Sequence, residues 1–489
     1  MGLEQRGSRL TASAVTPAGE REAHQPTLVR GMSLLDSTLL VVGGCLGSAI
    51  FLVPNDIATA LPSPPLYLLI WVAGAIVTLM AAVSLAELGT MFPEAGGQYI
   101  YLREAFGDFS AYLFGWMVFV AGGTGGISTL VVAFARYLGK AFPALRADAV
   151  LFSVPGFSVH ATHISSQTWN FTRGDVVAVT CIAVLTVVNV LGLRRAVILQ
   201  NVATWLKYGA VAVFVVFGFV VGKGHWGNFQ VNPAPAALSG GLYPFLASAG
   251  VAFIAVFWAY EGWEYATWAS GEMKNPERTI PRSLTMGIMA IAGIYIAASA
   301  VYVYAMPTGI IAKQDTVAQT AAQILFSPTI AYWLSLVIAL SCFGAASSNI
   351  LAGARVIYAM GVDGVFFRRM GTVHPRYRTP SFALIAQGIL AAAIALSGTY
   401  DQLFTYTTFG MILSYLACIG ALFVLRAKRP DTPRPYRCWG YPWVPAVYGI
   451  AMGGWVINTV VQRPKEALSC VILLAVGVPL YVWCKKKGS

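Results

Sequence analysis

The stretch that decides the fold is "VVGGCLGSAIFLVP", residues 41–54, which lies inside a segment apolar enough to enter a membrane. It nevertheless contains Gly43, Gly44 and Gly47, and it ends at Pro54. Glycine and proline are the residues that most weaken a helix interior. We therefore expect the helix to break here and the break to form a binding site. The alternative is that the glycines only allow close packing between helices.

The composition places most of the chain in a membrane. Of its 489 residues, 57% are hydrophobic and 11% are charged, whereas soluble proteins carry roughly 25% charged residues. A spanning helix needs about 20 apolar residues, and strand-like alternation is absent, so we predict an all-α bundle of twelve transmembrane helices. The predicted spans are 34–60, 66–91, 109–138, 175–193, 202–222, 242–270, 283–306, 328–358, 382–397, 402–425, 443–461 and 467–484.

The positive charge is distributed as in a membrane protein and does not indicate nucleic-acid binding. The formal net charge is +12, and basic clusters follow the even-numbered spans, as at Arg194-Arg195 and Arg368-Arg369. This asymmetry is the positive-inside rule. It predicts a multi-pass protein of the cell membrane with both termini cytoplasmic. Residues 1–32 are polar and are expected to form a disordered cytoplasmic tail, and 485–489 a basic one.

The sixth predicted span carries a second interruption. Within "AVFWAYEGWEYATWASGEMKNPERTIPRSL" (255–284), Glu261, Gly262 and Glu264 fall in an otherwise apolar helix. A carboxylate at a helix centre costs about 2.5–3.5 kcal/mol on insertion scales, so such groups normally face a watery cavity or a partner. Interruptions five spans apart indicate a transporter built from inverted repeats, whose broken helices meet at the midplane.

The broken helices predict the ligand. A break frees N–H groups, which attract an anion, and C=O groups, which attract a cation. A zwitterionic α-amino acid carries both charges. We expect the amides near Gly47, Ser48 and Ala49 to hold its carboxylate. The carbonyls near Cys45 and along 258–261 would hold its ammonium group.

Several blocks of the sequence resemble one transporter family. In chain order these are "GSAIFLVP" (47–54), "AELGTMFPEAGGQYIYLREAFG" (86–107), "FWAYEGW" (257–263), "EMKNPERTIPRSL" (272–284), a block over 340–380 and "RPYRCWGYPWVP" (434–445). Together they resemble the amino acid–polyamine–organocation transporters, and within them the L-type amino acid transporter branch. The resemblance implies a LeuT-like fold of five-plus-five inverted repeats with discontinuous helices 1 and 6. It also implies alternating access, with a transport core over 33–426 and two additional helices over 427–484.

The resemblance also singles out Lys207 in the fifth span. It matches a lysine of sodium-independent members, where the amine looks like a replacement for a bound sodium ion. Such an amine could donate to the carbonyls freed near Gly44 and Cys45. The alternative is a lysine that snorkels to the membrane interface.

Two positions depart from the family pattern. Ala49 stands where relatives usually have glycine, and alanine adopts fewer backbone conformations, so the carboxylate cradle is expected to be shaped differently. Glu261 stands where many relatives have a small residue. Its carboxylate could pair with a cationic substrate side chain, or it could be a proton-coupling group. It could also form a structural ion pair with Lys207 or an arginine.

The resemblance suggests roles for other side chains. Trp258 looks like an aromatic gate above the substrate, and Ser347 and Asn349 line up with pocket positions. Glu264 is expected to face the cytoplasmic vestibule, and Glu272 to form a scaffold or inner-gate ion pair with the nearby arginines. Residues 314–326 are too short to span and are expected to form an outer-face helix.

No catalytic constellation, phosphate-binding loop, cofactor motif or metal site is evident. His160 and His163 have a suggestive spacing but no third ligand. The outer loop 139–174 contains no cysteine, so the disulfide-linked heavy chain of animal relatives is not expected. The resemblance therefore suggests a stand-alone, prokaryotic member, monomeric or homodimeric in the bilayer.

These observations predict a sodium-independent amino acid transporter, either an exchanger or a facilitator. Two alternatives remain open at this point. One is a proton-coupled permease for cationic amino acids or amines, which Glu261 would favour. The other is an amino-acid sensor that binds its ligand without transporting it.

Overall fold

The computed structural model describes residues 28–154, 158–159, 164–165, 169–230, 241–314, 316–397, 400–462 and 464–488. All structural statements below concern these residues. The predicted disordered tail lies almost wholly outside them, as do His160 and His163.

Eleven helical segments of the described chain are long and apolar enough to cross a membrane. The predicted ninth span is α17 (Ser381–Ser397), an apolar helix of 17 residues. The expected all-α membrane fold is therefore confirmed. The eleven segments are α1 with α2 (Leu34–Cys45, Ala49–Leu52), α4 (Pro64–Met91), α6 with η1 and α7 (Asp108–Met117, Val118–Gly122, Gly123–Ala141), α8 (Arg173–Val190), α9 (Leu193–Val220), α11 with α12 (Leu242–Tyr260, Tyr265–Trp268), α13 (Pro276–Ala305), α16 (Pro328–Val362), α18 (Tyr400–Lys428), α19 (Trp443–Gln462) and α20 (Pro464–Gly488).

Short helices connect these spans. One of them, α15 (Val317–Leu325), is the short helix predicted within 314–326, and its apolar face is buried. The remaining short helices are α3 (Pro54–Ala60), α5 (Gln98–Phe106), η2 (Pro143–Leu145), η3 (Trp226–Phe229), η4 (Ser270–Glu272), α14 (Thr308–Ile311) and η5 (Arg368–Gly371).

The loop between the third and fourth spans contains strands that were not predicted. Strand β1 (Val150–Val154) pairs antiparallel with β4 (Trp169–Thr172), and β2 (Ser158–Val159) pairs antiparallel with β3 (Ile164–Ser165). The first pair is rich in aromatic and β-branched residues, which favour strands. Since the indole N–H of Trp169 donates to the carbonyl of Leu396, this pair is fixed to the end of α17.

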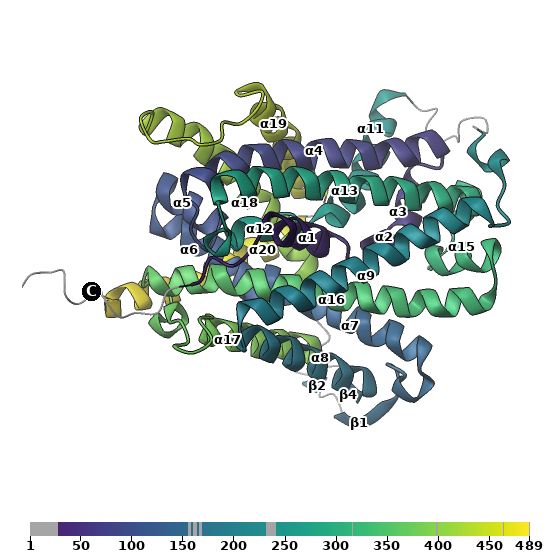
Figure 1. Cartoon of the computed structure of the whole chain (residues 1–489), viewed down its shortest axis with the longest axis horizontal. Coiled ribbons are helices and arrows are strands. Elements are labelled where there is room, and N and C mark those ends of the chain that lie inside the picture. Colours follow the sequence, from purple (N-terminus) through teal and green to yellow (C-terminus); the bar gives the residue numbers. More distant parts are fainter. Residues whose placement is uncertain are drawn as a thin grey trace, which may run out of the picture.

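The two interrupted spans lie at the centre of the bundle. Figure 1 shows the long helices α4, α13, α9 and α16 side by side, with the purple helix α1 among them and α12 next to it. Helix α1 packs against α13, α9, α16 and α12. As predicted, the first span is discontinuous between α1 and α2, and the sixth between α11 and α12. Matching breaks in the first and sixth spans are what a five-plus-five repeat requires.

Candidate functional site

The break in the first span leaves several backbone groups outside helical hydrogen bonding. Helix α1 ends at Cys45, and α2 begins at Ala49. In between, the amide of Gly47 donates to the carbonyl of Cys45 at 2.7 Å, which is a turn and not a helical bond. No hydrogen bond among the described residues uses the amides of Ser48 and Ala49. The break therefore presents free N–H groups in the middle of the bundle.

The break in the sixth span depends on one glycine. Gly262 has φ +104°, a conformation that L residues with side chains rarely adopt. Its amide donates to the carboxylate of Glu264 at 3.1 Å. The carbonyl of Glu264 in turn accepts the amide and hydroxyl of Thr267. The side chain and backbone of Glu264 thus fix the turn that separates α11 from α12.

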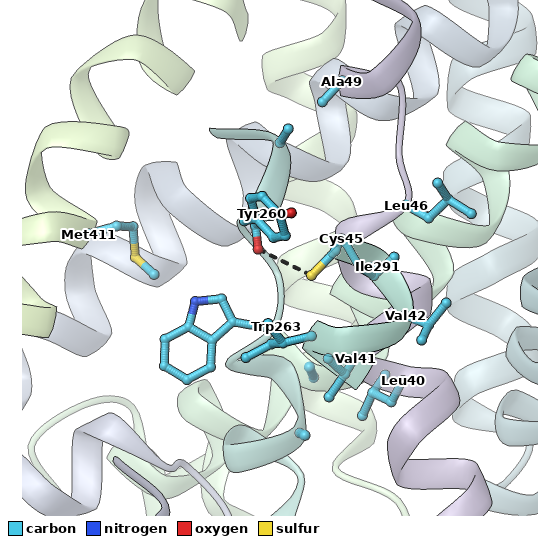
Figure 2. Close-up of a cluster of buried hydrophobic side chains, with 14 of the residues drawn as sticks. Leu40, Val41, Val42, Cys45, Leu46, Ala49, Tyr260, Trp263, Ile291 and Met411 are labelled. Atoms are coloured by element: carbon cyan, nitrogen blue, oxygen red, sulfur yellow. Dashed lines mark hydrogen bonds between the residues drawn. The ribbon is translucent and has the colours of Figure 1, made fainter. Parts of the chain in front are cut away.

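The two breaks touch each other through glycine. A Cβ atom on Gly44 would lie 2.5 Å from the carbonyl oxygen of Gly262, and a Cβ on Gly262 would lie 2.6 Å from the carbonyl carbon of Gly44. The thiol of Cys45 also donates to the carbonyl of Tyr260 at 3.1 Å, as Figure 2 shows. Glycine at both positions is therefore required for this approach and not only for flexibility.

Tyr295 of α13 joins the carbonyls released at both breaks. Its hydroxyl oxygen lies 2.7 Å from the carbonyl oxygen of Cys45 and 2.8 Å from that of Ala259. A hydroxyl has one proton to donate, so the two carbonyls share one donor. The ring of Tyr295 packs against Trp71 and Tyr260. Sequence reasoning missed this residue, because a tyrosine in a membrane helix gives no local signal of its partner.

We expect Tyr295→Phe to lower the free energy of unfolding by about 1–3 kcal/mol, because a buried carbonyl loses its donor while the ring contacts remain. Chemical denaturation of the purified protein in detergent measures this change. Tyr448→Phe is the matched control, since the Tyr448 hydroxyl is buried without a hydrogen-bond partner among the described residues. Equal effects of the two variants would contradict a bridging role for Tyr295.

Lys207 of α9 is anchored to the first break. Its side chain is fully buried, and its amine donates to the carbonyls of Gly43 and Leu46 at 2.7 Å each. The predicted link between the fifth span and the unwound part of the first is therefore present, although the acceptors flank Gly44 and Cys45. Ser341 of α16 donates to the carbonyl of Leu46 as well. A snorkelling lysine would be exposed at its end, so that alternative is wrong.

A cavity of about 70 Å³ lies at the two breaks. It brings together most of the predicted site residues, namely Cys45, Gly47, Ser48, Ala49, Trp258, Glu261, Glu264 and Asn349. By volume it holds roughly five waters, so it suits a small molecule. Its lining combines residues of both breaks with two carboxylates and three aromatic side chains, Trp258, Tyr265 and Trp268.

The third span contributes one wall that sequence reasoning missed. Gly122, Gly126, Thr129 and Leu130 line the cavity, at spacings that place them on one helical face. The π-helical segment η1, which ends at Gly122, interrupts this span, and such segments often occur at functional sites. The glycines of "AGGTGGIST" (121–129) were the available signal.

Three predicted residues lie differently from the expectation. Ser347 is buried but does not line the cavity, unlike Asn349. Gly262 contacts Gly44 behind the cavity lining. Glu264 was expected at the cytoplasmic vestibule but is 1% exposed and lines the cavity, because the unwound turn redirects its side chain.

Glu261 and Glu264 have no cationic partner among the described residues. No ion pair of the described residues includes either carboxylate, so the structural pairing considered for Glu261 is wrong within that part of the chain. One oxygen of each carboxylate is buried without a hydrogen-bond partner there, as is Oδ1 of Asn349. Unpaired polar atoms in a cavity indicate that a ligand satisfies them.

Glu272 lies beyond the cavity along the sixth span and forms an ion pair there. Its carboxylate accepts two hydrogen bonds from the guanidinium of Arg355 in α16, at 2.6 and 3.0 Å. Both side chains are fully buried. The partner is therefore a distant arginine of the eighth span and not one of those that follow Glu272 in sequence. The amides of Gly31 and Met32 also donate to the Glu272 carbonyl.

The family model "Amino acid permease" matches residues 32–478, which includes both breaks, Lys207 and the whole cavity. The chain belongs to the amino acid permease family. It is 27% identical over 466 residues to the serine/threonine exchanger SteT of Bacillus subtilis, covering 94% of this chain and 98% of that protein. It is 28% identical to the b(0,+)-type amino acid transporter 1 of Mus musculus, covering 94% and 89%. It is 25% identical to the cystine/glutamate transporter of Homo sapiens, covering 96% and 88%.

Proposed function

We propose that this permease is a sodium-independent amino acid transporter of the cell membrane, an exchanger or a facilitator that works by alternating access. The observation that carries the proposal is the cavity enclosed by two helix breaks. It presents the unused amides of Ser48 and Ala49 next to the carbonyls at the ends of α1 and α11, where an oxygen with one donor can accept a second hydrogen bond. Relatives over nearly the whole chain are named as amino acid transporters or exchangers.

The substrate carboxylate is assigned to the amides at Gly47, Ser48 and Ala49. Two of these amides have no other acceptor among the described residues, and all three residues line the cavity. Unused backbone N–H groups are a ready site for an anion. The substrate ammonium group is assigned to the carbonyls at the ends of α1 and α11, next to Cys45.

Independence from sodium is supported by the position of Lys207. Carbonyl oxygens at a helix break are typical ligands for Na⁺ in transporters with discontinuous helices. Here the carbonyls of Gly43 and Leu46 already accept hydrogen bonds from the Lys207 amine. The fixed ammonium group supplies the positive charge that a sodium ion would bring.

Uptake into proteoliposomes tests the proposal. The purified protein is reconstituted with and without internal amino acid, and uptake of labelled amino acids is measured in sodium and in choline buffer, at acidic and neutral pH. We expect uptake that is equal in the two buffers. Acceleration by internal substrate would identify an exchanger, as the name of the Bacillus subtilis relative suggests. Equal uptake into empty vesicles would identify a facilitator.

Other outcomes would overturn the proposal. Uptake that requires sodium would contradict the role assigned to Lys207. Uptake driven by an inward proton gradient would indicate a proton-coupled permease. Binding of an amino acid without any uptake would indicate a sensor.

A further inference from the structure

The central cavity has more negative than positive groups. Glu261 and Glu264 both line it, and the described cations near it are already engaged. Lys207 donates to backbone carbonyls, and Arg355 is paired with Glu272. Two carboxylates in one small cavity repel each other when both are ionised. A zwitterionic substrate would not relieve this repulsion, because its single ammonium group is offset by its own carboxylate.

The unsatisfied side-chain atoms of the cavity are all hydrogen-bond acceptors. Oε2 of Glu261, Oε1 of Glu264 and Oδ1 of Asn349 are buried, accept no hydrogen bond from the described residues, and belong to residues that line the cavity. Asn349 is 1% exposed and comes from α16, so it is independent of the carboxylate pair. The hydroxyl of Tyr415 interacts with both carboxylates but has only one proton to donate. A ligand with several N–H groups would satisfy all three acceptors.

The two carboxylates are held differently. Glu264 is fixed at the start of α12, where its second oxygen accepts the amide of Gly262. Glu261 accepts no hydrogen bond from a described backbone donor, shares the Tyr415 hydroxyl with Glu264, and is partly exposed at the cavity. The Glu261 side chain is therefore the one that can change its conformation to contact a ligand. Trp258, Tyr265 and Trp268 also line the cavity, and aromatic faces attract ammonium groups.

We propose that the substrate is an amino acid with a short cationic side chain, whose second ammonium group donates its N–H groups to Glu261, Glu264 and Asn349. This rests on the proposed function and deepens it. A short side chain is specified because the cavity volume is about 70 Å³. Diaminobutyrate has the required chemistry: it carries an extra ammonium group on a two-carbon side chain.

The test compares diaminobutyrate with homoserine, which has the same number of non-hydrogen atoms but ends in a hydroxyl. Uptake and exchange of both are measured in proteoliposomes at neutral pH without a proton gradient, together with competition by ornithine and lysine. We expect diaminobutyrate to be preferred over homoserine by at least tenfold. We expect Glu261→Gln to reduce this ratio at least tenfold while homoserine is still taken up, and Glu264→Gln to reduce it less. Glu277→Gln, at an exposed carboxylate in the first turn of α13, is the matched control and should keep the ratio.

Several results would overturn the inference. One is a wild-type preference for homoserine, which decides the question even where a glutamine variant does not fold. Another is a Glu261→Gln variant that keeps the preference. A third is a variant that loses only stimulation by a proton gradient, since Glu261 would then carry protons. In the first two cases amino acid uptake continues and the proposed transport function stands. The third case would indicate a proton-coupled permease and would contradict both proposals, and failure of every amino acid to be taken up would contradict the transport function itself.

Discussion

Replacing Arg355 by Met is expected to lower the free energy of unfolding by about 3–5 kcal/mol, because it leaves the Glu272 carboxylate buried without its partner. The ion pair is bidentate, with both side chains fully buried. It also connects the end of the sixth span to the eighth. Chemical denaturation in detergent, followed by tryptophan fluorescence, measures the change.

Two further variants separate the ion pair from a general effect of removing charge. Arg146→Met removes the partner of Asp148 in a pair whose side chains are more than half exposed, and we expect its stability to stay near that of the wild type. The double variant Arg355→Met, Glu272→Gln removes both charges together and should recover most of the loss. If Arg355→Met were no less stable than Arg146→Met, the buried pair would not stabilise the protein.

The fold was predictable because membrane insertion leaves a strong record in the sequence. Long apolar segments predicted the spans, and glycine or glutamate residues within them predicted the breaks at 46–48 and 261–264. The strands β1 to β4 were missed because their segments are only two to five residues long, too short for a periodic pattern to be recognised. The partner of Glu272 was missed for a different reason. Arg355 is 83 positions away along the chain, and a single sequence does not show which residues so far apart are in contact.

The residues that line the cavity were predictable where the helix break itself places them. They were less predictable where the rotation of a helix about its axis decides which side chains face the cavity. Gly47, Ser48 and Ala49 follow from the break itself. Ser347 and Asn349 are two positions apart on α16, so they point to different sides of the helix, and only the packing of α16 decides which side faces the cavity. For Glu264 the helical periodicity failed, because the chain is unwound between Glu261 and Glu264. The bridge made by Tyr295 became visible only once the helices were assembled.

Replacing Lys207 by Met is expected to reduce uptake at least tenfold, in sodium and in choline buffer alike. The amine makes two hydrogen bonds to buried carbonyls, and a bond from a charged donor contributes about 1.5–3 kcal/mol. A loss of about 1.4 kcal/mol already changes an equilibrium tenfold. The carbonyl of Leu46 keeps Ser341 as a donor, whereas the carbonyl of Gly43 loses its side-chain donor, so the unwound segment loses its anchor on α9.

The matched control for this prediction is Lys223→Met, which removes an exposed ammonium group beyond the end of the same helix. Lys207→Arg adds a second test. A lysine needed only for its charge would tolerate arginine. The site holds a single nitrogen between the carbonyls of Gly43 and Leu46 at 2.7 Å each, and the larger, planar guanidinium group cannot reproduce that geometry. We therefore expect both Lys207 variants to lose uptake and Lys223→Met to keep it. Wild-type uptake by Lys207→Met would show that the ammonium group does not hold the transport-competent conformation of the first span.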